Sequence, residues 1–168
     1  MNAQVFWGGV ALVVGLSVAA QAEVRPQAAA DISRGRYLVA YGDCNSCHTQ
    51  GWLESDGTIP VTRWLTGTAI GFRGPWGTAY PANVRARFQQ ITEEQWLFMI
   101  KTRGGHPPME WTSLRVLTTD DQRAIYRFVR SLGAAGGPEP NDVPPGQTPK
   151  TPFYDVIPQS APSPRLKS

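Results

Sequence analysis

Cys44-Asn45-Ser46-Cys47-His48 is the most informative segment of the chain, because it holds both cysteines and one of the two histidines. Two cysteines at this spacing lie about one helical turn apart, so both thiols can form thioethers with the two vinyl groups on one edge of a haem. The histidine that follows then lies where its neutral imidazole can bind the iron. The motif predicts one covalently attached haem, with His48 as an iron ligand.

Three other chemistries compete for the same residues. A local disulfide explains Cys44 and Cys47 but leaves His48 without a role. A redox dithiol of the thioredoxin kind belongs in a βαβ context, which this Gly- and Pro-rich chain lacks. A structural zinc site needs four ligands, and His106 is the only further histidine that could contribute one. Haem attachment is the interpretation that uses all three motif residues.

Further motifs flank the haem motif in a characteristic order. Gly35 and Tyr37 precede it, Gly105-His106-Pro107-Pro108-Met109-Glu110-Trp111 lies far downstream, and an apolar helical pattern over 124–132 follows. With these motifs the chain resembles a mono-haem class I c-type cytochrome over about 31–133, and less closely the cytochrome subunits of periplasmic dehydrogenases. The resemblance implies an all-α, cytochrome c-like helical domain wrapped around one covalent haem, with a Pro-rich C-terminal extension.

The resemblance also implies a function. Haem c with its iron would be the cofactor, and the chain would carry electrons rather than act as an enzyme, either free or as the electron-transfer subunit of an oxidoreductase complex. A dehydrogenase would be the donor, and a cytochrome or oxidase the acceptor. Nucleic acid is not an expected partner, since a net charge of +3 is weak beside a phosphate-tracking surface. A haem enzyme or gas sensor with an open distal position is the alternative function, and a purely structural interaction module is a third.

The amino terminus predicts export to the periplasm. Residues 5–20 are apolar, and Ala20-Gln21-Ala22 is a small-x-small cleavage signature directly before Glu23. The apolar run is shorter than the roughly 20 residues of a membrane-spanning helix. We therefore predict a signal peptide at 1–22 and a flexible lead at 23–30. Because the first four residues lack Lys and Arg, an uncleaved membrane anchor stays open.

Three residues compete for the second iron position. Met109 is favoured because it follows Pro107-Pro108, whose fixed φ angles stiffen the loop, and because the resembled family places its ligand methionine in a similar loop. Met99 shares a helix face with Ile100, and a methionine there usually fills a gap in the core. His106 would give a haem with two histidine ligands. Iron bound by His48 and a thioether suits a carrier, since thioether ligation raises the reduction potential.

Three supporting roles are also expected. Pro60 follows His48 by twelve residues, and the resemblance implies that its carbonyl accepts the proton of the ligand imidazole. The guanidinium of Arg85 suits a haem propionate, although a solvated surface arginine is the alternative. Gly35 would let the first and last helices cross closely, against Tyr126.

Local patterns predict three helices. One begins near Asp31 and leads to Cys44. The second opens at the capping box Thr92-Glu93-Glu94-Gln95 and runs to about Arg103, and the third opens at Thr119-Asp120-Asp121-Gln122 and ends at Gly133.

Between the first and second helices, 49–90 reads as a loop around the haem, with short β segments at 59–62 and 66–72. Its aromatic residues are expected to wall the porphyrin: Trp52, Trp64, Phe72, Trp76 and Tyr80. The tail, 134–168, is rich in proline and is predicted to be extended. It is either passive or docks through Phe153-Tyr154 and Val156-Ile157.

Overall fold

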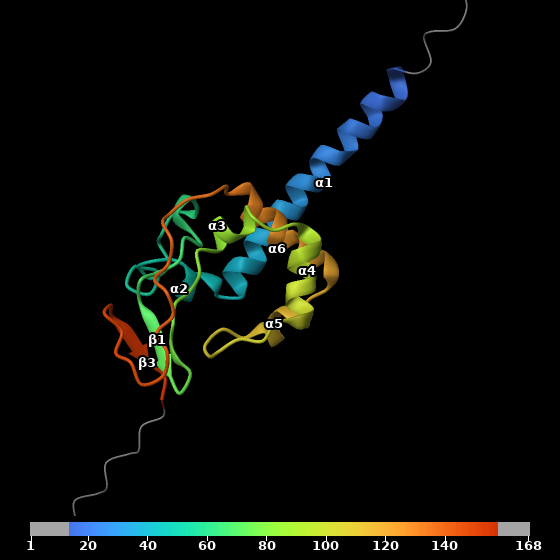
Figure 1. Ribbon diagram of the computed structural model, residues 1–168. Helices are drawn as coiled ribbons and strands as arrows, with labels where there is room; N and C mark the ends of the chain where they lie inside the picture. The colour runs from blue at the N-terminus through green and yellow to red at the C-terminus, as the bar shows by residue number, and fades with distance from the viewer. Residues whose placement is uncertain (1–13, 158–168) are drawn as a thin grey trace, which may run out of the picture.

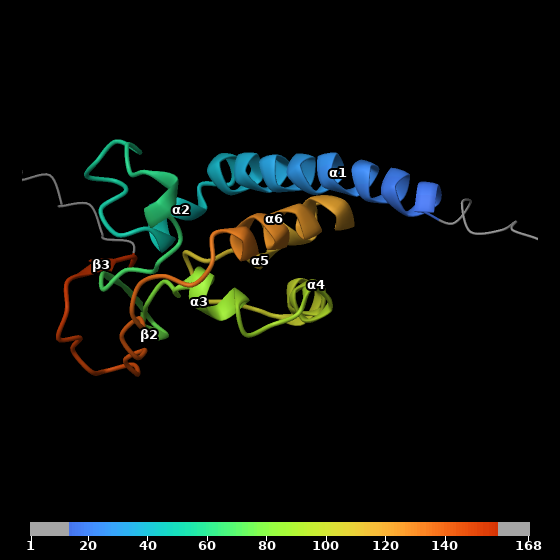
Figure 2. The same ribbon diagram turned by 90° about the horizontal axis from the view of Figure 1, so that it is seen from above.

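The computed structural model describes residues 14–157 (Figure 1). Its elements in chain order are α1 (Val14–Tyr41), α2 (Cys44–His48), the 3-10 helix η1 (Val61–Arg63), β1 (Gly71–Gly74), β2 (Gly77–Ala79), α3 (Val84–Phe88), α4 (Glu93–Thr102), α5 (Trp111–Arg115), α6 (Thr119–Ser131) and β3 (Phe153–Asp155). The long helices α1, α4 and α6 gather in one half of the molecule, whereas the strands and the C-terminal segment gather in the other (Figure 2). The segment with the two cysteines lies where the halves meet.

Helices α1 and α6 lie side by side and make the main packing contact of the helical half (Figure 2). Gly35 makes the contact possible, because a Cβ atom at this position would lie only 2.0 Å from the carbonyl oxygen of Ala124 and 2.7 Å from Cβ of Phe128. The prediction of a packing glycine in a close helix crossing is thus confirmed, but its partners are Ala124 and Phe128. Tyr126 packs instead on Phe88, at 5.6 Å between ring centroids.

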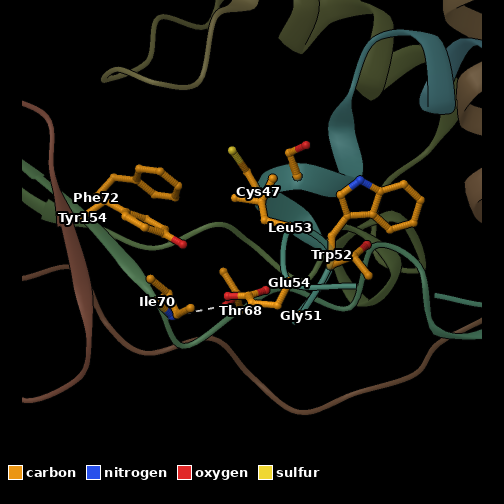
Figure 3. Close-up of a pocket in the computed structure, with 11 residues that line it drawn as sticks. Cys47, Gly51, Trp52, Leu53, Glu54, Thr68, Ile70, Phe72 and Tyr154 are labelled. Carbon is orange, nitrogen blue, oxygen red and sulfur yellow. Dashed lines mark hydrogen bonds between the residues drawn. The ribbon is translucent and has the colours of Figure 1, made fainter. Parts of the chain in front are cut away.

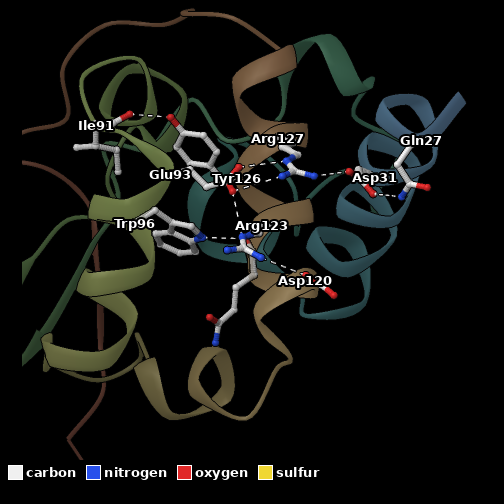
Figure 4. Close-up of polar contacts among 10 residues, drawn as sticks. Gln27, Asp31, Ile91, Glu93, Trp96, Asp120, Arg123, Tyr126 and Arg127 are labelled. Atoms are coloured by element: carbon white, nitrogen blue, oxygen red, sulfur yellow. Dashed lines mark hydrogen bonds and ion pairs between the residues drawn. The ribbon is translucent and has the colours of Figure 1, made fainter. Parts of the chain in front are cut away.

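The core lies between α1, α4 and α6, and polar groups join the three helices at its edge (Figure 4). The Trp96 indole donates to the carbonyl of Gln122 at 2.8 Å. Arg127 of α6 reaches both Glu93 of α4 and Asp31 of α1. The buried apolar residues that pack together in this core are Leu38, Val39, Trp64, Leu65, Phe88, Trp96, Ile100, Ala124, Ile125, Phe128 and Val129.

The helix ends follow the predicted capping patterns in part. Thr92 forms the predicted capping box with Gln95, and α4 ends at Thr102. In α6 the cap is Thr118, one residue earlier than predicted, since its side chain accepts from the Asp121 N–H. Gln122 does not return to the cap, because its amide donates to the carbonyls of Leu114 and Leu117. Gly133 follows the helix with φ of 68°, as a helix-ending glycine does.

The prediction of an all-α fold is wrong, because the C-terminal segment completes a three-stranded mixed sheet in the order β2-β1-β3. Strands β1 and β2 form an antiparallel hairpin, and β3 pairs with β1 in parallel. Gly71 N–H donates to Pro152 at 2.9 Å, and Val156 N–H donates to Arg73 at 2.9 Å. The apolar pair Phe153-Tyr154 therefore docks on the domain, and the described part of the tail is not passive.

The short β segments were misplaced by the sequence patterns. Within 59–62 no residue lies in a strand and the last two belong to η1, and of 66–72 only Gly71 and Phe72 belong to β1. Strand pairing decides these boundaries, since β1 extends only as far as it finds partners in β2 and β3.

Helix α1 includes 23–30, for which the sequence predicted a flexible lead, so that prediction is wrong. Alanines at 28–30 favour helix, and Gln27 donates to Asp31 one turn later at 2.9 Å. The predicted signal peptide lies mostly outside the described residues. Among residues 14–157, no helix is both long and apolar enough to cross a membrane.

Candidate functional site

The C-x-x-C-H motif forms the short helix α2, which follows α1 after a turn at Asp43 with φ of 52°. Asn45, between the two cysteines, is 1% exposed. Its Oδ1 accepts from the Thr49 hydroxyl at 2.7 Å, and the Thr49 Oγ1 accepts from the Leu65 N–H at 2.8 Å. This chain of hydrogen bonds fixes the motif against the following loop. This chain of hydrogen bonds could not be predicted from the sequence, because the identity of a residue inside the motif does not indicate whether it is buried.

Both cysteine thiols are free and half-buried. Burial raises the pKa of Cys44 to about 11 and also raises the pKa of Cys47. Both groups are therefore neutral thiols at physiological pH. The Cys47 sulfur points away from Thr68 and Ile70, which line a nearby pocket (Figure 3). Sequence position and structure agree that the two thiols lie one turn apart on a single short helix.

The His48 ring is held by one backbone group. Its Nδ1 lies 2.8 Å from the carbonyl oxygen of Ala82. A carbonyl only accepts, so Nδ1 carries the proton and Nε2 carries the lone pair. Burial lowers the pKa of His48, which favours the neutral ring. Within the described residues Nε2 has no hydrogen-bond partner, so its lone pair is available to a metal.

Ala82 takes the role that the resemblance implied for Pro60, which corrects that prediction. The Pro60 carbonyl accepts instead from the Arg63 N–H at 2.8 Å, inside the 3-10 turn. Gly67 lets the segment with Ala82 and Asn83 approach His48. Its φ is 78°, and a Cβ atom at this position would lie only 2.9 Å from the Asn83 nitrogen. A backbone carbonyl leaves no mark in the sequence, so only the structure identifies Ala82.

Arg85 is 5% exposed, so the alternative of a solvated surface arginine is wrong. Its guanidinium donates to the carbonyls of Thr62 at 2.7 Å and Gly133 at 2.8 Å, and also to that of Leu132. The bonds to Leu132 and Gly133 satisfy carbonyls at the end of α6, and the bond to Thr62 joins α3 to η1. Binding of a haem propionate by the remaining N–H groups stays a prediction.

The three candidates for the second iron position lie in different environments. Met109 is 39% exposed, and every residue of the loop 103–110 is exposed. His106 stacks on Trp76, with ring centroids 5.9 Å apart and planes 8° apart, which ties this loop to the β1–β2 hairpin. Met99 is only half-buried, and the partly buried residues packed on the core include Leu97 but not Met99. The prediction that Met99 fills the core is therefore wrong.

The predicted aromatic walls divide between two places. Trp64 is buried in the helical core and meets Trp52 edge-on at 5.5 Å. Phe72 packs on Tyr154 of β3 at 5.4 Å, and both rings border the pocket beside Cys47 (Figure 3). The tail thus supplies the Tyr154 ring next to the cysteine motif. From the sequence, docking of the tail was one of two alternatives.

Comparison with known proteins adds no relative: neither protein-family models, nor curated proteins, nor solved structures match the chain. Within residues 14–157, His, Cys, Asp and Glu form no group of three or more that could hold a metal ion. The geometry of the motif itself therefore carries the functional argument.

Proposed function

We propose that this protein is an exported c-type cytochrome that transfers one electron at a time between protein partners. The observation that carries the proposal is the arrangement of Cys44, Cys47 and His48 on one short helix. The Ala82 carbonyl orients the His48 imidazole, and Nε2 has no hydrogen-bond partner among residues 14–157. Metal-bound histidines usually donate a hydrogen bond from their other ring nitrogen, because this bond fixes the tautomer and raises the basicity of the ligand.

The residues fit a covalently bound haem. Two free thiols one turn apart match the two attachment points, and a neutral, half-buried imidazole matches an iron ligand. Cys44 and Cys47 would hold the macrocycle, His48 would bind one face of the iron, and Met109 is proposed for the other. When bound, haem supplies a one-electron ferric–ferrous couple. The chain contributes attachment, the orientation of His48 and the exclusion of water by Trp52, Phe72 and their neighbours.

Export is part of the proposal, with removal of 1–22 and a mature chain beginning at Glu23. Pro26 lies inside α1 in the full chain. In a chain beginning at Glu23 it would lie in the first turn, where proline costs little because those N–H groups have no intrahelical partner. The proposed location is the periplasm, with a dehydrogenase as donor and a cytochrome or oxidase as acceptor.

A second function, a haem enzyme or gas sensor, is favoured by one observation. Met109 is 39% exposed and its loop has few partners, which suits a weakly held or open iron position. The two functions differ in whether Met109 occupies the iron in the resting protein.

The test compares Met109→Ala with His106→Ala in the haem-loaded protein. Met109→Ala should abolish the long-wavelength thioether-to-iron band, lower the reduction potential and open the reduced protein to carbon monoxide, because it removes a ligand. His106→Ala should do none of these. Carbon monoxide binding by the reduced wild type would instead favour the enzyme or sensor, and loss of the band in His106→Ala alone would contradict the Met109 assignment.

A further inference from the structure

The tail carboxylate Glu139 meets the same peptide group that orients His48. The peptide between Ala82 and Asn83 accepts from His48 Nδ1 at its oxygen, at 2.8 Å. Its N–H donates to Oε2 of Glu139 at 3.1 Å. The two hydrogen bonds therefore run in series through one planar amide, from a carboxylate to a histidine ring.

The environment holds both ends of this series in place. Asn83 is 1% exposed, and its side-chain amide donates to the tail carbonyls of Ala135 at 2.8 Å and Gly137 at 3.0 Å. The Glu139 side chain is 16% exposed, and its other oxygen, Oε1, accepts from Arg87. Burial alone would raise the pKa of Glu139, but bonds from Arg87, its own N–H and the Asn83 N–H hold that pKa below its usual range, so the group is an anion.

We infer that Glu139 is a positioning residue that tunes His48 through the Ala82–Asn83 peptide, an inference that rests on the proposed function. An anion at the N–H polarises the amide and makes its carbonyl oxygen a stronger acceptor. A stronger acceptor at Nδ1–H increases the basicity of Nε2. A more basic ligand stabilises ferric over ferrous iron, so Glu139 lowers the reduction potential. Arg87 opposes this effect because it withdraws charge from the same carboxylate.

The test measures the His48 Nδ1–H and Asn83 N–H proton resonances and the reduction potential of the full-length protein. Glu139→Gln keeps an oxygen acceptor but removes the charge. Both resonances should move upfield and the potential should rise, while the melting temperature stays close to that of wild type. Arg87→Gln should shift the resonances and the potential in the opposite direction.

Asp142→Asn is the matched control. Asp142 is another tail carboxylate that accepts a backbone N–H, from Tyr80 at 3.0 Å, but that peptide does not meet His48. This variant should leave both resonances unchanged. Equal shifts in the two variants would show a general charge effect and overturn the inference. Shifts in Glu139→Ala but none in Glu139→Gln would reduce Glu139 to a structural contact and overturn it as well.

The inference and the proposed function can fail separately. If the chain carries haem but Glu139→Gln moves neither resonance, only the inference fails. If the chain carries no haem, the proposed function fails, and the two proton resonances still report whether the carboxylate polarises the peptide.

Discussion

The segment 44–49 and the loop 103–110 carry the two proposed iron ligands, and they differ in how their side chains are held. His48 lies in a segment fixed by Asn45, by the Leu65 N–H and by the Ala82 carbonyl. Met109 lies in a loop whose residues are all exposed and which contacts the β1–β2 hairpin through the His106–Trp76 stack. The fold thus orients the first proposed ligand by itself, whereas the second proposed ligand would depend on the proposed haem for its position.

The substitution that should destabilise the protein most disturbs the packing of α1 on α6, which supports the fixed segment 44–49. Gly35→Ala places a Cβ 2.0 Å from the Ala124 carbonyl oxygen, so α1 must move away from α6 and carry 44–49 with it. We expect a loss of about 3 kcal/mol in the free energy of unfolding, which exceeds the gain of about 1 kcal/mol from helix propensity. Thermal or denaturant unfolding of the purified protein measures it.

Gly104→Ala is the control in the exposed loop. A Cβ at this position meets nothing within 4 Å, so the change should stay within about 0.5 kcal/mol. Similar losses in the two variants would remove the distinction between the fixed segment and the loop.

A smaller effect is expected inside the fixed segment. Thr49→Val removes the hydroxyl that joins Asn45 to the Leu65 N–H, and leaves buried polar groups without partners. The cost should be about 1–3 kcal/mol. Thr102→Val, at the exposed end of α4, should cost less than about 0.5 kcal/mol in the same unfolding assay. A neutral Thr49→Val would mean that the hydrogen bonds do not hold the motif.

The comparison also shows what the sequence could indicate. The motif 44–48 could be recognised in the sequence because the proposed covalent attachment requires particular residue types at a particular spacing. Gly35 and the Thr92 cap could be predicted as well. A close helix crossing favours a small residue, and a helix N-cap favours a residue with a hydroxyl group. The Ala82 carbonyl and the Glu139 carboxylate could not be identified from the sequence. Every residue type has a backbone carbonyl, and the partners of both groups lie far away in the chain.

The tail shows the same limit. Its prolines indicated an extended chain, and Phe153-Tyr154 suggested docking, but a parallel pairing with β1 depends on a partner strand that was itself too short to predict. The all-α expectation failed here because a strand of three residues has too little periodicity to distinguish it from a loop.

The smallest effect concerns the ion pair that accompanies the Gly35 crossing. A hydrogen bond from Arg34 lowers the pKa of Asp121, so the pair stabilises the fold above the unfolded pKa of about 3.9, and this contribution disappears as pH falls through the folded pKa. Because the Arg34 guanidinium is exposed and screened by solvent, Arg34→Gln should lower the melting temperature only slightly at pH 7.

The melting temperatures of wild type and Arg34→Gln should converge in acid. Arg63→Gln, a change at an exposed position in η1, should track wild type throughout. A difference that persists at low pH would show that Arg34 acts by packing rather than by charge.

The decisive experiment for covalent haem attachment is the intact mass of the protein, purified from the periplasm of a host that matures c-type cytochromes. We predict a chain that begins at Glu23 and carries one haem, which denaturation does not release. The double variant Cys44→Ala, Cys47→Ala should carry none, because both attachment points are gone. A wild-type chain with the mass of the polypeptide alone, its thiols free or joined as a disulfide, would contradict the account.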